Sequence, residues 1–370
     1  MASPQKVLFF LDADKDDYYS LCLLAAQHYY GIIDVIGVVV DTGFVPNIQD
    51  GLLLTQQWLN KIQVATNLDT EDHGFPIKFN LYAGLPRPDF LKNRLFPKIW
   101  TNSFIVEMKN VYDITLPNFN YVTNEFTGEV VETGAPSVNI LFSELVNHPD
   151  KSILSLATGA PTSLGIGLDK FPFLSSKLSS AYCMASNYLV PGNVPKEDYI
   201  VADITVPSPY LDYSGEYNAF MNPYALQRVA LSAQNDVDVN IVPLDCTNYA
   251  NLVPSTVDEL KAIAEPFLYY VKTPWVVNLC GYFISLVETT LVTINSTLYL
   301  WDLCATNIAL GSNVDQFFIL GNPIIEVTGK IKQYSYDNTS DKVKIYMSLS
   351  YQKLLVNSIR IIFNDPAYKA

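Results

Sequence analysis

Residues 7–26 read VLFFLDADKDDYYSLCLLAA, and residues 32–41 read IIDVIGVVVD. The first stretch opens with a short apolar run and passes, after four carboxylates, into residues 18–29, which have helical length and few helix breakers. The second stretch is another apolar run, rich in β-branched residues and ending in Asp41. A strand, a helix and a strand in this order, with continuous rather than alternating hydrophobic residues, are typical of a parallel sheet that is covered on both faces.

The same order of elements returns further along the chain. Apolar runs predict strands over residues 152–156, 178–184 and 239–244, and intervening stretches predict helices over residues 162–168 and 223–234. We therefore predict a single α/β domain over residues 1–370, with a mostly parallel, Rossmann-like central β-sheet and helices on both faces. In such sheets ligands bind beyond the carboxyl ends of the strands. Polar or functional side chains at these ends mark the predicted site: Asp12, Asp14, Asp41, Thr158 and Met184.

Composition excludes several classes of protein. Hydrophobic residues make up 49% of the 370 residues, which is ample for a packed core and excludes wholesale disorder. The formal net charge of −14 argues against nucleic acid as a partner. The chain reaches its aspartates before a signal-peptide core could be completed, so a cytoplasmic location is expected. Residues 275–300 are the most apolar run, but polar residues interrupt it, and we expect a buried helix with its flank rather than a membrane span.

Five cysteines are scattered along the chain, with an odd count and no C-x-x-C pair. A disulfide scaffold or a zinc ribbon is therefore not expected, and buried, reduced thiols are predicted.

The acidic cluster Asp12-Ala13-Asp14-Lys15-Asp16-Asp17 places four carboxylates in six residues directly after a predicted strand. Capping of a helix that begins at Tyr18, by Asp16 or Asp17, explains one or two of them but not four. An EF-hand fits poorly, because Asp17 holds the place of the turn glycine and Leu23 that of the bidentate glutamate. Haloacid-dehalogenase-type phosphatases also begin with a strand and D-x-D, but Lys15 and Asp16 stand where that family has Gly-Thr.

The opening resembles that of the inosine-uridine preferring nucleoside hydrolase family, in which a strand runs into D-x-D-x-x-x-D-D and then an apolar helix. The resemblance continues, in the same order as in that family, over roughly residues 5–310. The segments that carry it are LYAGLPRP at 81–88, LATGAPTS at 156–163, CMAS at 183–186, GEYN at 215–218 with Asn222-Pro223, VPLDCT at 242–247 and WDLCA at 301–305. Seven weak motifs in one order are improbable by chance.

The resemblance implies a nucleoside hydrolase-like fold and hydrolysis of the N-glycosidic bond with one Ca²⁺ as cofactor. The ion would be held by the carboxylates of Asp14, Asp17 and Asp302 and by the main-chain carbonyl of Thr158. Asp14 would also be the general base, and Asp12 would orient that assembly. The residues that would surround the sugar are Asp16, Met184, Asn193, Glu216 and Asn218.

The leaving base separates the branches of that family. Members that accept pyrimidines carry His before the last Asp, whereas this chain has Trp301, and its histidines, His28, His73 and His148, lie outside every matched motif. LFPKIW at residues 95–100 adds Trp100, which resembles the purine-specific branch, where two indoles sandwich the purine. The resemblance therefore implies a purine nucleoside as substrate. Core packing is the alternative role of both tryptophans.

The chain also departs from the family pattern. Only Lys15 separates the second and third aspartates, where the family has three residues. Either a tightened loop retains its metal ion, or the ammonium of Lys15 offsets the aspartates in place of calcium. These departures leave a second reading: a catalytically inactive homologue that serves as a binding or structural assembly protein, which the 24 tyrosines would suit. A homo-oligomer is expected in either case, and a D-x-D phosphohydrolase is the third alternative.

Overall fold

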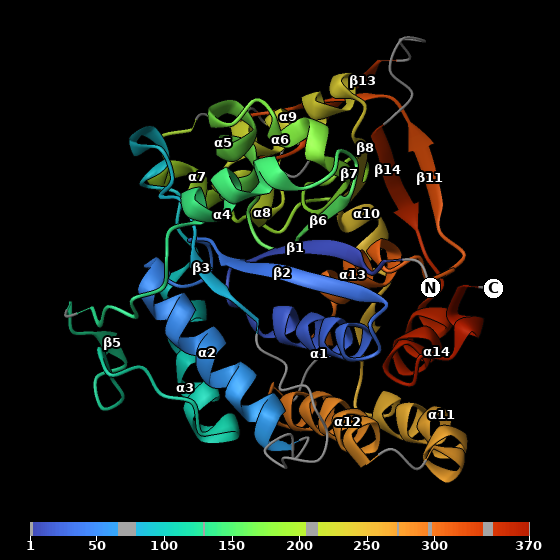
Figure 1. Cartoon of the computed structure of the whole chain (residues 1–370). Coiled ribbons are helices and arrows are strands. Elements are labelled where there is room, and N and C mark those ends of the chain that lie inside the picture. The colour runs from blue at the N-terminus through green and yellow to red at the C-terminus, as the bar shows by residue number, and fades with distance from the viewer. Residues whose placement is uncertain are drawn as a thin grey trace.

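A computed structural model describes residues 3–65, 79–128, 130–204, 214–271, 274–294, 298–335 and 343–369, so His73 lies outside the described residues. An eight-stranded sheet, in the order β11-β14-β8-β7-β6-β1-β2-β3, divides the molecule (Figure 1). All its neighbouring strands are parallel except β11, which is antiparallel to β14. The predicted mostly parallel sheet is confirmed. The strands of this sheet are β1 (Gln5–Leu11), β2 (Ile33–Val40), β3 (Leu81–Ala83), β6 (Ile153–Ala157), β7 (Leu178–Met184), β8 (Asp238–Val242), β11 (Phe317–Leu320) and β14 (Val343–Ser348).

Three pairs of short strands lie outside the central sheet. They are β4 (Phe119–Asn120) with β5 (Glu125–Phe126), β9 (Asn251–Leu252) with β10 (Leu298–Tyr299), and β12 (Asn322–Ile325) with β13 (Ile331–Ser335).

Helices cover both faces of the sheet (Figure 1). In the lower half of the figure lie α1 (Lys15–Tyr29), α2 (Ile48–Ala65), α3 (Lys98–Tyr112), α11 (Thr256–Tyr270), α12 (Pro274–Ile294) and α14 (Tyr351–Ile362). In the upper half lie α4 (Val138–Glu144), α5 (Thr162–Lys170), α6 (Leu174–Lys177) and α9 (Pro223–Leu231). The remaining helices are α7 (Lys196–Val201), α8 (Tyr217–Met221), α10 (Leu244–Thr247) and α13 (Trp301–Ala309), with 3₁₀ turns at Asp89–Leu91, Leu145–Asn147, Ser232–Asn235 and Pro366–Lys369.

The central strand β1 explains why the hydrophobic pattern of the sequence is continuous. Val7, Phe9 and Leu11 pack into the core that α1, α12 and α14 share, whereas Leu8 and Phe10 pack into the core under α4, α5 and α9. Successive side chains of a strand point to opposite faces, so a strand with helices on both sides needs apolar residues at every position. The sheet therefore separates two cores, and its carboxyl edge is free to carry polar groups.

The helix after β1 begins earlier than predicted. Asp14 is its N-cap, and α1 starts at Lys15 rather than at Tyr18, so neither Asp16 nor Asp17 is the N-cap residue. The side chains of Asp14 and Asp17 form a capping box. The Asp14 carboxylate accepts a hydrogen bond from the backbone N–H of Asp17, and the Asp17 carboxylate accepts one from the backbone N–H of Asp14. With a loop this short, the helix has to begin almost directly at the strand end.

Helix α12 matches the predicted buried helix. Among the described residues it alone has the length and composition to cross a membrane, with a mean hydropathy of 1.5 over Pro274–Val292, of which 56% is buried. Its inward face, including Leu279, Phe283 and Val287, belongs to the main core, as expected for a core helix. The five cysteines are free and buried, which confirms the prediction of reduced thiols.

Candidate active site

A cavity of about 360 Å³ lies at the carboxyl edge of the sheet, where the site was predicted. Each predicted catalytic, sugar-binding or metal-binding residue contributes to its wall except Asp17. The predicted residues that line it are Asp12, Asp14, Asp16, Trp100, Thr158, Met184, Asn193, Glu216, Asn218, Trp301 and Asp302. Asp41, at the end of β2, is fully buried and instead accepts hydrogen bonds from the backbone N–H and the hydroxyl of Ser163.

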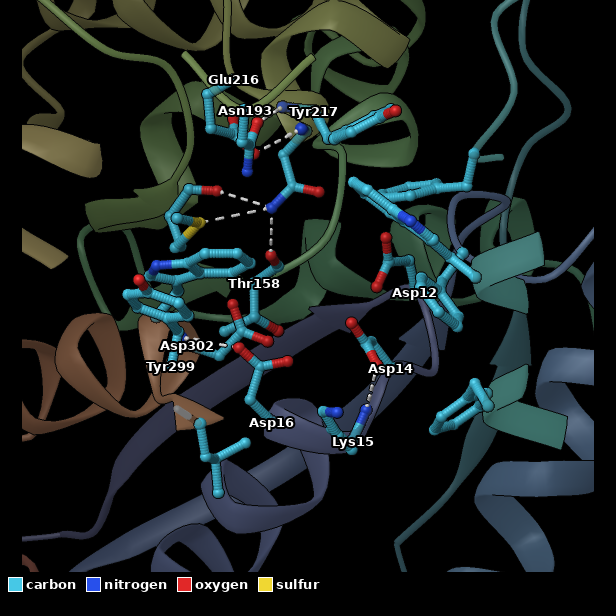
Figure 2. Close-up of a pocket in the computed structure, with 18 of the residues that line it drawn as sticks. Asp12, Asp14, Lys15, Asp16, Thr158, Asn193, Glu216, Tyr217, Tyr299 and Asp302 are labelled. Atoms are coloured by element: carbon cyan, nitrogen blue, oxygen red, sulfur yellow. Dashed lines mark hydrogen bonds between the residues drawn. The ribbon is translucent and has the colours of Figure 1, made fainter. Parts of the chain in front are cut away.

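Four carboxylates form what we call the acidic floor of the pocket: Asp12, Asp14, Asp16 and Asp302. Figure 2 shows Asp16 and Asp302 side by side below Thr158, with Asp14 and Asp12 further along the same side. Asp302 enters from the first turn of α13 and its backbone N–H lies 3.4 Å from Asp16 Oδ2. The packing of α13 against α1 therefore joins segments that lie almost 300 residues apart in the chain.

Burial controls the electrostatics of this floor. It raises the pKa of Asp12, Asp16 and Asp302 well above the usual value, and repulsion between the neighbouring carboxylates raises these pKa values further. Burial also raises the pKa of Asp14, but the ammonium of Lys15 opposes that rise. Burial and like charge therefore favour the protonated form of these carboxyls, whereas the Lys15 ammonium favours the ionised form of Asp14.

Asp17 lies behind the pocket wall and clamps the loop that carries the floor. Its Oδ2 accepts the N–H groups of Asp12 at 3.2 Å and of Asp14 at 3.0 Å, and its Oδ1 accepts the hydroxyl of Thr158. Ala13, between the two residues whose N–H groups are held, has a φ of +69°. A positive φ is strained for alanine, so the clamp holds a conformation that the loop would not adopt freely.

Two glycines, Gly43 and Gly159, make room for Asp12, a role that no sequence pattern predicts. A Cβ atom on Gly159 would lie 2.7 Å from the Cβ and backbone nitrogen of Asp12, and one on Gly43 would overlap the Asp12 carboxylate. Any side chain at either position would therefore displace Asp12 from the floor.

The calcium ligand set that the resemblance implies does not fit this arrangement. Both oxygens of Asp17 are hydrogen-bonded within the protein, and the Thr158 carbonyl accepts the Asn218 side chain at 2.7 Å. Across the described ranges, no group of three or more His, Cys, Asp or Glu side chains is arranged so that it could hold a metal ion. The carboxylates of Asp14, Asp17 and Asp302 are therefore not grouped as a ready set of metal ligands in this structure, and the prediction that they surround an ion together with Thr158 stays a prediction. The shortened loop accounts for this, because it draws Asp17 into the capping box.

The opposite end of the pocket is built from short loops and α8. Glu216 is the N-cap of α8 and accepts N–H groups from Ser186 at 2.7 Å, Asn218 at 2.7 Å and Ala219 at 3.0 Å. Burial raises the pKa of Glu216 to about 7, against the effect of these donors. Asn218 also donates to the Met184 carbonyl at 3.0 Å, and Asn193 accepts the N–H of Tyr217 at 2.9 Å. The predicted sugar-binding residues therefore meet, and hydrogen bonds fix them in place (Figure 2).

Aromatic side chains form the walls of the pocket. On one side Tyr217 stacks on Phe96, with ring centroids 4.4 Å apart, and Trp100 meets the same tyrosine edge-on at 5.3 Å. On the other side Trp301 stacks on Tyr299 at 5.2 Å. Trp100 is 44% exposed, so it is a rim residue and not part of the core, whereas the buried Nε1 of Trp301 has no hydrogen-bond partner within the described structure.

Sequence reasoning missed several lining residues: Phe44, Phe96, Ser103, Phe104, Glu107, Tyr217, Leu298 and Tyr299. Lys15, which it named as a counter-charge to the aspartates, also lines the cavity. Tyr217 stands inside the GEYN segment and Tyr299 two residues before Trp301, so proximity to a motif could have indicated both. The α3 residues follow no motif. Only their helical spacing from Trp100 could have indicated that they lie on the same side of the helix as Trp100.

Comparison with known proteins agrees with this geometry. The family model described as inosine-uridine preferring nucleoside hydrolase matches residues 7–354. The chain belongs to this nucleoside hydrolase family. The match extends past the region of the motifs, so the C-terminal strands of the sheet are part of the same nucleoside hydrolase fold.

Solved nucleoside hydrolases share the fold at low sequence identity. The inosine-uridine preferring nucleoside hydrolase from Bacillus anthracis is 20% identical, with 97% of this chain and 99% of that chain covered and a TM-score of 0.63. The purine-preferring ribonucleoside hydrolase from Gardnerella vaginalis is 16% identical, with 99% and 100% covered and a TM-score of 0.63. An inosine-guanosine nucleoside hydrolase is 14% identical, with 97% and 99% covered and a TM-score of 0.60. No relative among the curated proteins matches the chain.

Proposed function

We propose that this nucleoside hydrolase cleaves the N-glycosidic bond of purine ribonucleosides to give free base and ribose. The observation that carries the proposal is the juxtaposition in one cavity of a buried acidic floor and stacked aromatic walls. Carboxylates suit activation of water and stabilisation of an oxocarbenium-like transition state. Aromatic faces suit the binding of a planar base, and a larger ring gains more from stacking.

In the proposed reaction, water attacks C1′ of the ribose and the bond from C1′ to the base nitrogen breaks. The electron pair of that bond goes to the base, which takes up a proton from solvent, while Asp14 accepts a proton from the attacking water and later releases it to solvent. Asp12 lies next to Asp14 in the loop and supports its orientation. Asp16, Asn193 and Asn218 provide polar contacts for the sugar hydroxyls, and Met184 and Glu216 complete the wall beside them.

The proposed steps do not pass through a cation. Of the ligand set expected from the resemblance, Asp17 and the Thr158 carbonyl accept internal hydrogen bonds, and Lys15 supplies positive charge next to Asp14.

Purine specificity rests on Trp301 and on the wall that faces it. The stacked pair Tyr299–Trp301 and the group Phe96–Trp100–Tyr217 both line the cavity, so a flat ring between them would contact aromatic surface on either side. The described structure holds no histidine in this pocket, and leaving-group stabilisation is assigned to stacking.

A substrate panel tests the proposal. Purified protein is incubated with inosine, guanosine, adenosine, uridine and p-nitrophenyl phosphate, and free base, ribose and phosphate are measured. We expect base and ribose from the purine nucleosides, at least tenfold less from uridine, and no phosphate release. Phosphate release would favour the D-x-D phosphohydrolase. Absence of turnover from a folded protein that still binds inosine would favour the inactive homologue.

A further inference from the structure

One face of α3 lines the pocket with a row of side chains, and the last side chain in this row is a carboxylate. Trp100, Ser103, Phe104 and Glu107 all line the cavity, at the spacing that places residues on one side of a helix. Lys15, the first residue of α1, lines the same cavity. A cation and an anion from two different helices therefore meet in a pocket whose walls are otherwise largely aromatic.

The pair formed by Lys15 and Glu107 is loose. Lys15 Nζ lies 4.0 Å from Glu107 Oε2, whereas charge-assisted hydrogen bonds between nitrogen and oxygen are about 2.7–2.9 Å long. The Glu107 side chain is only 10% exposed, and its Oε1 is buried without a hydrogen-bond partner in the described part of the chain. A buried carboxylate oxygen without a donor is costly and calls for an explanation. A ligand that donates to the carboxylate and accepts from the ammonium would satisfy both groups.

We propose that Lys15 and Glu107 form hydrogen bonds to the edge of the purine ring. This inference rests on the proposed function and names the residues that would recognise the base. The 6-oxopurines carry an acceptor, O6, beside a donor, N1–H, and 6-aminopurines carry a donor beside the acceptor N1. In the first class the ammonium donates to O6 and the carboxylate accepts from N1–H. In the second the ammonium donates to N1 and the carboxylate accepts from the amino group. The terminal torsion of a glutamate is broad, so rotation presents either oxygen of Glu107 to the base.

This pairing divides recognition between two physical effects. Stacking on the aromatic walls depends on the ring face and accepts any purine. Hydrogen bonds to a buried pair depend on the edge, and a ligand that lacks the complementary groups leaves the charges unpaired. The pair therefore selects purines with an exocyclic group at position 6 over unsubstituted purine.

Binding of free bases tests the proposal without depending on turnover. Calorimetric titration compares hypoxanthine, which has the donor and the acceptor, with unsubstituted purine, which lacks the exocyclic group. We expect wild type to bind hypoxanthine at least about tenfold more tightly than purine, which corresponds to about 1.4 kcal/mol. Glu107→Gln and Lys15→Met should each lower the affinity for hypoxanthine by more than the affinity for purine, and so remove most of this preference.

The control is Glu288→Gln, because Glu288 pairs with Lys261 at 2.9 Å on the exposed surfaces of α11 and α12. This variant should keep the full preference, and circular dichroism should show that all variants are folded. Equal affinity of wild type for the two bases, no binding of hypoxanthine, or a preference that persists in both variants would overturn the proposal. If the preference follows the pair but inosine is not cleaved, the proposed function fails and this inference stands.

Discussion

The acidic floor and the aromatic walls of the pocket are built in opposite ways. Asp12 and Asp14 follow β1 and are fixed by the Asp17 clamp, and Asp16 and Asp302 are set by the packing of α1 against α13. The walls come from α3 and the loop before it, from α8, and from β10 with the first residue of α13. Ring contacts join them, and Trp100 remains 44% exposed. The floor is therefore suited to catalysis, which needs groups held in fixed positions. The walls are suited to binding of the base, because ring contacts tolerate small adjustments.

Removal of one charge from the floor should have the largest effect. Asn is as good an N-cap as Asp, so Asp14→Asn keeps the cap of α1 but cannot accept a proton from water. We expect kcat for inosine to fall by about 10³-fold or more, since general-base catalysis contributes about 10²–10⁴-fold. Ribose release measures this loss, and a thermal unfolding midpoint within a few degrees of wild type shows that the fold is intact.

Asp14→Ala separates chemistry from capping at the same position. It should lose the same activity and also about 1 kcal/mol of stability, because the cap is removed. Activity of Asp14→Asn within tenfold of wild type would show that the floor does not supply the base.

Removal of an aromatic wall residue should have a smaller effect, and this effect should fall on the binding of the base. In Trp301→Ala the stack on Tyr299 and the surface offered to the ligand are both lost. We expect the affinity for hypoxanthine to fall about 10–100-fold, in line with about 1–3 kcal/mol for a stacked base, and Trp301→Phe to recover part of it. Unchanged hypoxanthine binding in Trp301→Ala would assign the indole to core packing instead.

A buried carboxyl next to the floor gives a pH dependence of stability. Burial raises the pKa of Asp41 to about 7, although hydrogen bonds from Ser163 and Leu85 oppose the rise. In the unfolded chain the pKa is about 3.9, so the folded state binds the proton more tightly. The contribution of Asp41 to stability is therefore full below about pH 4 and is lost as the pH rises to about 7.

Urea unfolding at pH 5 and pH 8 checks this sign. Wild type should lose roughly 1–3 kcal/mol more than Asp41→Asn between the two pH values, whereas Trp301→Ala should lose as much as wild type. An Asp41→Asn variant with the same pH dependence as wild type would contradict the assignment.

Calcium should have the smallest effect of all. The oxygens of Asp17 and the Thr158 carbonyl are already hydrogen-bonded. We therefore expect CaCl₂ at about 1 mM, a concentration that fills even weak calcium sites, to shift the thermal unfolding midpoint by less than about 1 °C. A rise of several degrees that Asp17→Asn abolishes would show that the ion breaks the clamp and recruits Asp17.

The sequence was a good guide to the floor and a poor one to the walls. Continuous apolar runs ending in aspartate located β1, β2 and the carboxyl edge, because strand ends and site coincide in parallel sheets. Asp302 was found by its motif, since no local pattern reveals a contact between α1 and α13. Tyr217, Phe96 and Glu107 depend on how loops and helices pack around the pocket, which hydrophobic periodicity does not encode.

The position of Asp17 shows the limit of motif transfer. The residue type and order match the family, but the two missing residues start α1 at Lys15 and turn the Asp17 carboxylate to the backbone of the loop. Spacing alone could not tell whether the tightened loop would retain a metal ion or have its charge offset by Lys15. In the structure the Asp17 carboxylate accepts the N–H groups of Asp12 and Asp14, and the Lys15 ammonium opposes the rise in the Asp14 pKa.

We propose above that the acidic floor hydrolyses a nucleoside held between the aromatic walls. Incubation of the purified protein with inosine in H₂¹⁸O, followed by mass spectrometry of the sugar, tests it most directly. We predict equimolar hypoxanthine and ribose, with one ¹⁸O bonded at C1 in the wild-type product, and a rate of product formation lower by about 10³-fold or more with Asp14→Asn. Intact inosine after prolonged incubation with the folded wild-type protein, or equal turnover by Asp14→Asn, would contradict the account.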